Sequence, residues 1–175
     1  MAVRTILTEP NKILRQKSLD VEIVDKELQN FMDDMLETMY AASGIGLAAI
    51  QVGVPKRIIV MDINKDNKNK NIMYFINPKI VWKSSENSIY EEGCLSVPNQ
   101  FAEIHRPEEC HVEYLDYNGE SKLIKAKGLL ATCIQHEIDH LEGILFIDYL
   151  SKLKKSMIIK KLSKQKKTNI DRIVV

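Results

Sequence analysis

The sequence predicts an α+β fold in which antiparallel sheets surround one central helix, followed by a C-terminal helix. Apolar residues recur at helical spacing over residues 25–41 and again over 128–142. Apolar runs and apolar–polar alternation over 57–63, 72–82 and 110–126 are typical of strands. These strands and helices do not alternate as βαβ units do, which favours α+β over a doubly wound parallel sheet.

The first helix is predicted over 25–41, with Asp25 as its N-cap. Its leucines and methionines share one face, so we interpret them as core residues and not as a cofactor site. The Gly-rich segment SGIGLAAIQVGVPK, residues 43–56, follows and is interrupted by Pro55.

Three strand-like stretches follow this segment. RIIVMDI, residues 57–63, has the composition of a buried strand, and the polar loop 64–71 separates it from the next strand at 72–82. The stretch 110–126 is predicted to be a hairpin, because Asn118-Gly119 is a typical two-residue turn between alternating segments.

Two helices are expected near the C-terminus. The first covers GLLATCIQHEIDHLE, residues 128–142, and Gly143 can end it. The second begins near Ser151 and continues to about Lys167, so that residues of about 150–170 form a basic C-terminal helix.

Length and composition narrow the class of protein. We expect one catalytic domain over 1–175, long enough to bury a core. A formal net charge of +1 argues against a general nucleic-acid binder. No apolar run is long enough to cross a bilayer, and MAVRTILTEPNK lacks the apolar region of a secretory signal. Three cysteines without an export signal favour a reducing, cytoplasmic location.

The segment CIQHEIDHLEG, Cys133 to Gly143, holds two histidines four residues apart. Residues i and i+4 of a helix share one face, so His136 and His140 can bind the same ion. Glu137 lies about 100° around the helix from His136, beside such an ion. This H-E-x-x-H spacing is typical of metallohydrolases in which the glutamate transfers protons for an activated water. The alternative is a solvated amphipathic helix in which the histidines are incidental.

A catalytic site of this kind usually has three protein ligands and one open position. In the longer metzincin pattern the third ligand is a histidine six residues after His140, where this chain has Phe146. Cys133 shares the face of His136, but it lies seven residues, roughly 10 Å along the axis, from His140. Cys133 is therefore better explained as a pocket wall or a small buried residue.

The remaining cysteines are Cys94 and Cys110. Cys110 alternates within a strand pattern and is predicted to be in the core. Cys94 follows Gly93 in the turn-like segment EEGCLSVP, and a loop thiol can be brought to a helix face as a thiolate ligand. Elimination thus favours Cys94 as the third ligand, with a free turn cysteine as the alternative.

Three short segments carry a family resemblance. GIGLAAIQ (44–51), EGCLS (92–96) and QHEIDH (135–140) resemble, in order and spacing, the three signature motifs of peptide deformylases. The resemblance extends over nearly the whole chain, from about Ala2 to the last helix. It implies a metal-dependent hydrolase that removes the formyl group from the N-terminal formyl-methionine of newly made polypeptides and releases formate.

The resemblance also implies roles for individual residues. It assigns Cys94, His136 and His140 to the metal and Glu137 to general acid/base catalysis. Gln51, through its side-chain amide, and the backbone N–H of Leu95 are implied as donors to the developing oxyanion. For Gln51 the alternative is a hydrogen bond that closes its own loop.

Substrate binding is predicted to involve GIGLAA and the face of the His136 helix. Gly46 is implied as a backbone contact to the peptide, and glycines permit such close approach. Ile45 flanks this glycine, and Leu129 and Cys133 lie on the His136 face, so these three are candidates for the methionine pocket. Ordinary core packing, or a plain turn around Gly46, is the alternative.

The C-terminal helix carries eight lysines and no acidic residue between Ser151 and Lys167. Leu150, Leu153, Met157, Ile158 and Leu162 are predicted to form an apolar stripe opposite the lysines. The lysines suggest a patch for anionic RNA, and the resemblance implies contact with the ribosome. A solvated helix docked on the body is the alternative.

The sequence therefore predicts a monomeric metallohydrolase with no membrane association. One thiolate and two imidazoles suit iron, zinc, nickel or cobalt, and the resemblance implies Fe2+ as the natural occupant. Two rivals remain: a peptidase that cleaves internal bonds, and a structural metal module that binds a partner. The absence of a C-x-x-C pair to close a structural site favours chemistry over the second rival.

Overall fold

The computed structural model describes residues 2–64 and 70–171. The described residues form the following helices, 3-10 turns (η) and strands: η1 (Lys12–Arg15), α1 (Lys26–Ala41), β1 (Gly46–Ala48), η2 (Ala49–Val52), β2 (Ile58–Met61), β3 (Met73–Lys83), β4 (Asn87–Cys94), β5 (Val97–Pro107), β6 (Glu109–Leu115), β7 (Ser121–Lys127), α2 (Leu129–Leu141), η3 (Phe146–Tyr149) and α3 (Lys152–Asp171).

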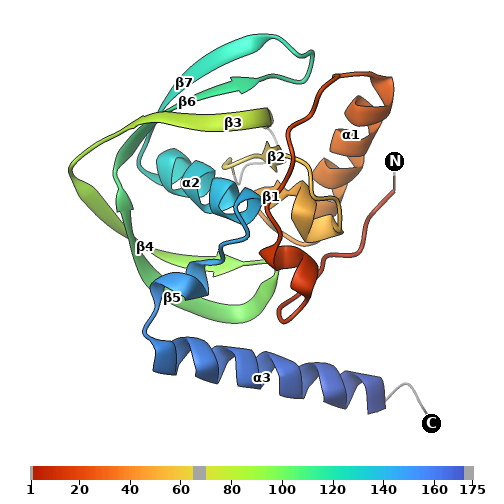
Figure 1. The fold of residues 1–175 in the computed structure, drawn as a ribbon, viewed down its shortest axis with the longest axis vertical. Helices are drawn as coiled ribbons and strands as arrows, with labels where there is room; N and C mark the ends of the chain where they lie inside the picture. Colours follow the sequence, from red (N-terminus) through yellow and green to blue (C-terminus); the bar gives the residue numbers. More distant parts are fainter. Residues whose placement is uncertain (1, 65–69, 172–175) are drawn as a thin grey trace.

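The strands form two antiparallel sheets that enclose α2 (Figure 1). Five strands pair in the order β1-β2-β3-β6-β7, and β4 pairs with β5 in a sheet of two. One face of the larger sheet packs on α2: Phe75 and Val112 of the sheet and Ile134 of the helix belong to one buried cluster. The region around Val60 packs on the α1 methionines instead. The predicted α+β class, with antiparallel sheets around the histidine helix, is confirmed.

The two edges of the five-stranded sheet differ in length and charge. β1, at one edge, has only three residues, all buried. β7, at the other edge, has seven residues, SKLIKAK, and exposes three lysines. Lysines on an edge strand discourage pairing with other chains, because their charges oppose stacking of a further strand.

Local caps and turns in the sequence correctly predicted the ends of several of these elements. The side chain of Asp25 accepts a hydrogen bond from the Leu28 N–H at 2.8 Å, as expected of the N-cap of α1. Gly119, with φ +81°, occupies the turn of the β6–β7 hairpin. Gly143, with φ +73°, follows the end of α2. Most of the predicted loop 64–71 lies outside the described residues.

The β4–β5 sheet was not predicted, because the inward positions of β4 are mostly polar. Along β4 the exposed residues alternate with Ser88, Tyr90 and Glu92, which face inward. A polar inner row gives no apolar–polar alternation, so the segment around Cys94 resembled a turn. The turn itself is only two residues long, since Cys94 pairs directly with Val97.

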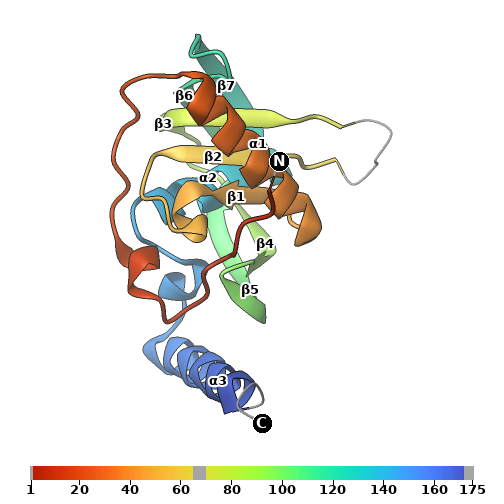
Figure 2. The same ribbon diagram turned by 90° about the vertical axis from the view of Figure 1, so that its right-hand side faces the viewer.

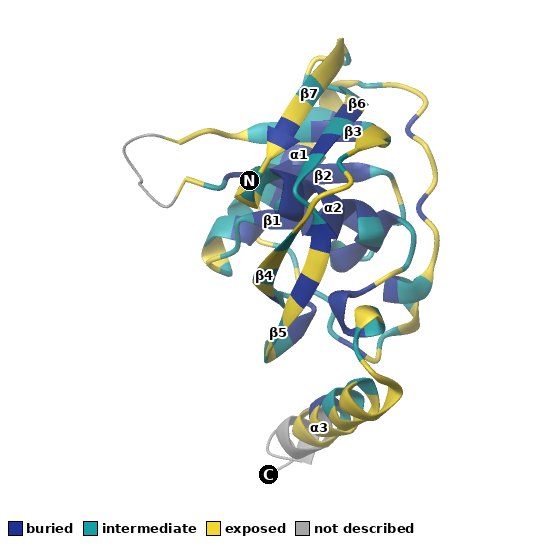
Figure 3. Cartoon of the chain, turned by 90° about the vertical axis from the view of Figure 1, so that its left-hand side faces the viewer, coloured by how far each residue is buried: buried dark blue, intermediate teal, exposed yellow. Residues whose placement is uncertain are grey.

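Helix α3 lies against the β4–β5 side of the molecule, as Figures 1 and 3 show. Ile158, Ile159 and Leu162 pack against Val97 and neighbouring apolar residues. The predicted stripe is wrong for Leu153 and Met157, which are 72% and 62% exposed. The docked face is rotated toward Ile159, so these two side chains lie among the exposed lysines. No helix in the described ranges has the length and apolar character needed to span a membrane.

Candidate metal centre

Helix α2 brings the two predicted histidines to one buried face. His136 is 8% exposed and His140 only 1%. Their ring centroids lie 4.9 Å apart and the rings are nearly perpendicular, at 82°. This is the arrangement expected of residues one helical turn apart, and it leaves both rings able to direct a nitrogen at one point.

The sulfur of Cys94 reaches the same point from the β4–β5 sheet. Its Sγ atom lies 3.3 Å from Nε2 of His140. One ligand atom from each of Cys94, His136 and His140 can be chosen so that all lie within 4.8 Å of one another. Within residues 2–64 and 70–171, this is the one such group of three His, Cys, Asp or Glu side chains.

These three donors fit a borderline-soft divalent metal, and their neighbours support that use. The Sγ atom of Cys94 accepts hydrogen bonds from the Ser96 N–H at 3.4 Å and from the Gln51 amide at 3.6 Å, which hold the sulfur in place. A thiolate with two imidazoles is a common donor set for zinc and for other first-row metals. These three side chains therefore form a candidate metal site whose donors come from two separate elements.

A buried ion-pair network orients His136. Its Nδ1 atom lies 2.8 Å from Oε2 of Glu92, and Arg106 donates to the same oxygen at 3.0 Å. Burial opposes ionisation of Glu92, but hydrogen bonds from His136 and Arg106 hold its pKa below the usual value. Arg106 also bonds to Asp139 at 2.8 Å. With Nδ1 engaged by the carboxylate, Nε2 of His136 is left to bind a metal.

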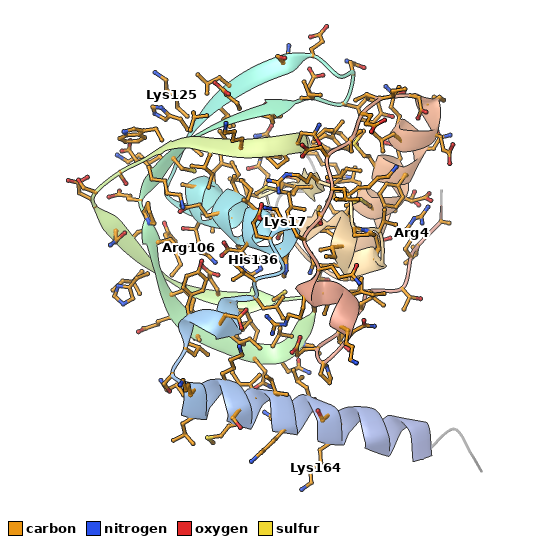
Figure 4. The ribbon with its side chains drawn as sticks, viewed as in Figure 1. Arg4, Lys17, Arg106, Lys125, His136 and Lys164 are labelled. Carbon is orange, nitrogen blue, oxygen red and sulfur yellow. The ribbon has the colours of Figure 1, made fainter. Side chains whose placement is uncertain are left out.

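Figure 4 shows His136 and Arg106 side by side between α2 and the smaller sheet. Neither Arg106 nor Asp139 was identified as part of this network from the sequence. The available signal was the inward position of charged residues on β4 and β5, which could not be recognised before the strands themselves were known.

Glu137 lies beside this centre and is 5% exposed. Its Oε2 atom is buried without a hydrogen-bond partner, and burial raises the pKa of Glu137 to about 7. A buried carboxylate without a partner is unfavourable unless a cation or a polar ligand approaches it. Its geometry therefore suits a group that exchanges protons with a bound molecule.

Gly46, in β1, lies directly against Glu137. A Cβ atom added at Gly46 would be 2.5 Å from Oε1 of Glu137 and 2.9 Å from its Cδ atom. The carboxylate therefore occupies space that only a glycine leaves free.

Replacing Gly46 with alanine is expected to displace the Glu137 carboxylate and lower kcat by about 10²-fold. The metal ligands do not depend on this space, so bound metal should stay at the wild-type level. Steady-state kinetics and elemental analysis of the purified variant would test both statements. Wild-type kcat in the alanine variant would show that the position of Glu137 is not critical.

Gln51 is 1% exposed and connects β1, η2 and the Cys94 turn. Its Oε1 atom accepts the Ala48 N–H at 2.9 Å, so the loop-closing bond considered as the alternative is present. Its Nε2 atom donates to Ser96 Oγ at 3.0 Å, which places the amide N–H groups next to the sulfur of Cys94. Leu95 and Ser96 form the two-residue turn between Cys94 and Val97.

The three pocket candidates differ from the core residues of α2. Leu129 is 39% exposed, while Cys133 and Ile45 are partly buried. Ala131 and Ile134, on the opposite side of the helix, are fully buried. Burial raises the pKa of Cys133 to about 12, and its sulfur is not in the group of donors formed by Cys94, His136 and His140.

Cys110 lies away from the centre, in β6. It is fully buried in the core between α2 and the large sheet, as predicted. Burial raises its pKa to about 11.

Comparison with known proteins identifies the family. The family model described as polypeptide deformylase matches residues 3–156. The chain belongs to this family. A peptide deformylase from Pelagibacter ubique (strain HTCC1062) is 71% identical over 170 residues, which cover 97% of this chain and 99% of that protein.

Two solved structures are also similar. The crystal structure of a peptide deformylase from Ehrlichia chaffeensis has a TM-score of 0.92 at 47% identity and covers 97% of this chain and 99% of its own. A Met-Ala-Ser-bound class I type b peptide deformylase from Acinetobacter baumannii has a TM-score of 0.81 at 34% identity, with 85% of this chain and 99% of its own covered. The chain is accordingly a hydrolase, and deformylation of peptides is the activity of its family.

Proposed function

We propose that the chain removes the formyl group from the N-terminal formyl-methionine of new polypeptides, using one divalent ion held by Cys94, His136 and His140. The observation that carries this proposal is the placement of one thiol and two imidazole donors within 4.8 Å of one another. The buried Glu137 carboxylate lies next to them and has one oxygen without a partner. A structural metal site would fill its fourth position with a further ligand, and no such fourth His or Cys is grouped with these three in the described residues.

A formamide is an unreactive amide, so both the nucleophile and the carbonyl need activation. A divalent ion at this site supplies it, because it lowers the pKa of a water from 15.7 to about 7 and polarises a carbonyl oxygen. Glu137 accepts the proton of the attacking water and transfers it to the leaving amine. Its burial assists both steps, since a carboxyl with a pKa of about 7 is a stronger base than an ordinary one and still carries a proton to donate near neutral pH.

The tetrahedral oxyanion needs donors fixed in place before the reaction. The Gln51 amide is oriented by its bond to the Ala48 N–H, which directs its nitrogen toward the Cys94 turn. We assign one oxyanion donor to this amide and a second to the Leu95 N–H. A donor of this kind is typically worth about 3–4 kcal/mol in the transition state.

The peptide is proposed to bind along β1, the short edge strand that contains Gly46. Main-chain hydrogen bonds at a sheet edge recognise an extended peptide whatever its side chains. Ile45, Leu129 and Cys133 then offer apolar surface for the methionine side chain. The Met-Ala-Ser tripeptide bound by the Acinetobacter baumannii relative is consistent with a methionine-first peptide in this position.

We assign Fe2+ as the natural metal, with Zn2+, Ni2+ or Co2+ able to replace it. The donor set suits all four ions. Purification without oxygen, followed by elemental analysis and activity measurements after reconstitution with each metal, distinguishes them.

A comparison of three substrates tests the proposed activity. The wild-type protein should release formate from formyl-Met-Ala-Ser and should not hydrolyse unformylated Met-Ala-Ser. A longer peptide without a formyl group should stay intact, because cleavage of an internal bond would indicate the rival peptidase. No formate release from any reconstituted form would exclude the proposed function.

We propose that the enzyme is cytoplasmic and monomeric. We further propose that the exposed side of α3 contacts ribosomal RNA. Lys154, Lys160 and Lys161 are exposed there beside Leu153 and Met157. Lys155 is engaged with Asp148 and anchors the helix instead. Lysines on one exposed helix face can neutralise phosphates, and the resulting affinity depends strongly on salt.

Changing Lys154, Lys160 and Lys161 to glutamine should weaken co-sedimentation with ribosomes at low salt. Each lost phosphate contact reduces the salt dependence of binding by about one unit of slope in a log–log plot. Glutamine at Lys79, Lys122 and Lys125, which are exposed on the large sheet, provides a control of equal charge change. A truncation after Leu150 should bind as weakly as the helix variant. Equal binding by all forms would remove this role for α3.

A further inference from the structure

Residues 7–18, here called the N-terminal belt, contact each segment that carries a proposed metal-site residue. Figure 2 shows the chain descending from its N-terminus past β1 to η1 and then climbing along the outside of the molecule to α1. The belt contributes no proposed ligand or catalytic group. Its bonds nevertheless converge on the η2 segment, the Cys94 turn and the end of α2.

Two backbone bonds attach the belt to the oxyanion-donor segments. The Leu7 N–H donates to the carbonyl of Gln51 at 2.7 Å, and the Glu9 N–H donates to the carbonyl of Ser96 at 2.9 Å. Gln51 and Ser96 are also joined directly through their side chains. The belt therefore fixes both the residue that presents the amide and the turn that contains Leu95.

Two further contacts attach the belt to the end of α2. The Ser18 N–H donates to the carbonyl of Leu141, next to His140, at 2.8 Å. The backbone of Arg15 approaches Gly143 so closely that an added Cβ would lie 2.6 Å from the Arg15 carbonyl oxygen. The contacts at Leu141 and Gly143 thus attach the end of α2 to the belt.

An ion-pair chain links the belt to itself and to η3. Glu9 is only 6% exposed, and its Oε1 atom lies 3.1 Å from Nη2 of Arg15. The other terminal nitrogen of Arg15 bonds to Asp148. Asp148 accepts the Leu145 N–H at 2.8 Å, so the pair is tied to the segment that follows α2. Arg15 therefore connects Glu9, which is bonded to the Cys94 turn, with Asp148, which lies in the segment after α2.

We propose that Arg15 and Glu9 are positioning residues that set the spacing between the Cys94 turn, the Gln51 amide and His140. The sulfur and the imidazoles belong to different elements, so their separation depends on what connects those elements. The belt is such a connection, and it acts through the turn and the end of α2 without touching the metal. This inference rests on the proposed function, because it assumes that these groups form the working centre.

The proposal predicts that Arg15→Met accelerates metal loss. The Co2+-loaded protein is mixed with excess EDTA at a temperature where it is fully folded, and the visible absorption of bound Co2+ is followed. Loss should be about tenfold faster than in the wild type, the size of effect typical of outer-sphere partners. Deformylation by the freshly loaded variant should show a lower kcat with KM changed by less than about twofold, because oxyanion donors act in the transition state.

Arg15→Lys and Glu9→Gln complete the series. Lysine keeps the charge but not the two-pronged geometry, so Arg15→Lys should recover part of the wild-type retention of metal. Glu9→Gln removes one charge and keeps the side-chain volume, so it should accelerate metal loss less than Arg15→Met. If Arg15→Met does not fold, Glu9→Gln decides the question by the same measurement.

Arg4→Ala is the matched control. Arg4 lies before the belt, pairs with Asp34 of α1 at 2.9 Å, and is placed away from His136 in Figure 4. The variant loses an ion pair on the same N-terminal segment, so it should lose stability in urea while its metal-loss rate stays at the wild-type value.

Two results would overturn the proposal. The first is a folded Arg15→Met or Glu9→Gln protein that loses Co2+ at the wild-type rate. The second is an equal acceleration in Arg4→Ala, since loss would then follow global stability and not the belt. If the wild type released no formate, the proposed function would fail, whereas the chelator rates would still test the belt.

Discussion

Replacing Glu137 with alanine is expected to lower formate release by about 10²–10⁴-fold while the protein keeps its metal. The carboxylate is buried beside the thiol and imidazole donors, and one of its oxygens has no hydrogen-bond partner among the described residues. No other carboxylate is similarly placed among the described residues, because Glu92 is engaged by His136 and Arg106. Formate release from formyl-Met-Ala-Ser and metal content, measured without oxygen on one preparation, test the two parts.

Glu142→Ala is the control for this variant. Glu142 follows the last residue of α2, and it is paired with Arg57 and Lys17 on the molecular surface. Its removal should leave kcat near the wild-type value. Full activity in Glu137→Ala would show that another group transfers the proton, and loss of metal would show that Glu137 also acts in binding.

Cys94→Ala is expected to lose both the metal and the activity. The sulfur is one of only three donors, and it lies 3.3 Å from Nε2 of His140. Two imidazoles alone hold a divalent ion far more weakly, and the buried N–H groups of Ser96 and Gln51 would lose their acceptor. Elemental analysis after gel filtration and the same formate assay measure the two losses.

Cys110→Ala provides the comparison for a buried thiol outside the site. Cys110 lies in β6 and its thiol is held neutral by burial, so its loss should reduce stability slightly and leave the metal in place. Metal retained by Cys94→Ala would contradict the ligand assignment and direct attention to Cys133.

Elements with a clear apolar period were predictable from the sequence. Helix α1 and the β6–β7 hairpin were found because cap, turn and periodicity all agreed, as in Asp25 and Asn118-Gly119. The exposed faces of α3 were not predicted correctly, since a helix with apolar residues on several sides can dock in more than one rotation. Contact with the β4–β5 side determines that Ile159 is covered and Met157 is not.

The site could be predicted only in part for a related reason. The spacing of His136 and His140 follows from helix geometry, but the distance from Cys94 to His140 depends on how a strand of one sheet meets a helix. The local sequence does not determine that distance. Cys94 was therefore predicted as a ligand by elimination and by family resemblance. Arg106 was missed because its partners, Glu92 and Asp139, lie on β4 and α2.

The contrast between the two sheet edges has a consequence for which chains the enzyme can process. β7 is long and protected by positive charge, whereas β1 spans only three residues, all of them buried. If the peptide binds along β1 as proposed, so short a strand contacts only its first few residues, and the residues beyond them are not selected. Such brevity would let one catalyst serve thousands of unrelated protein products while they are still unfolded.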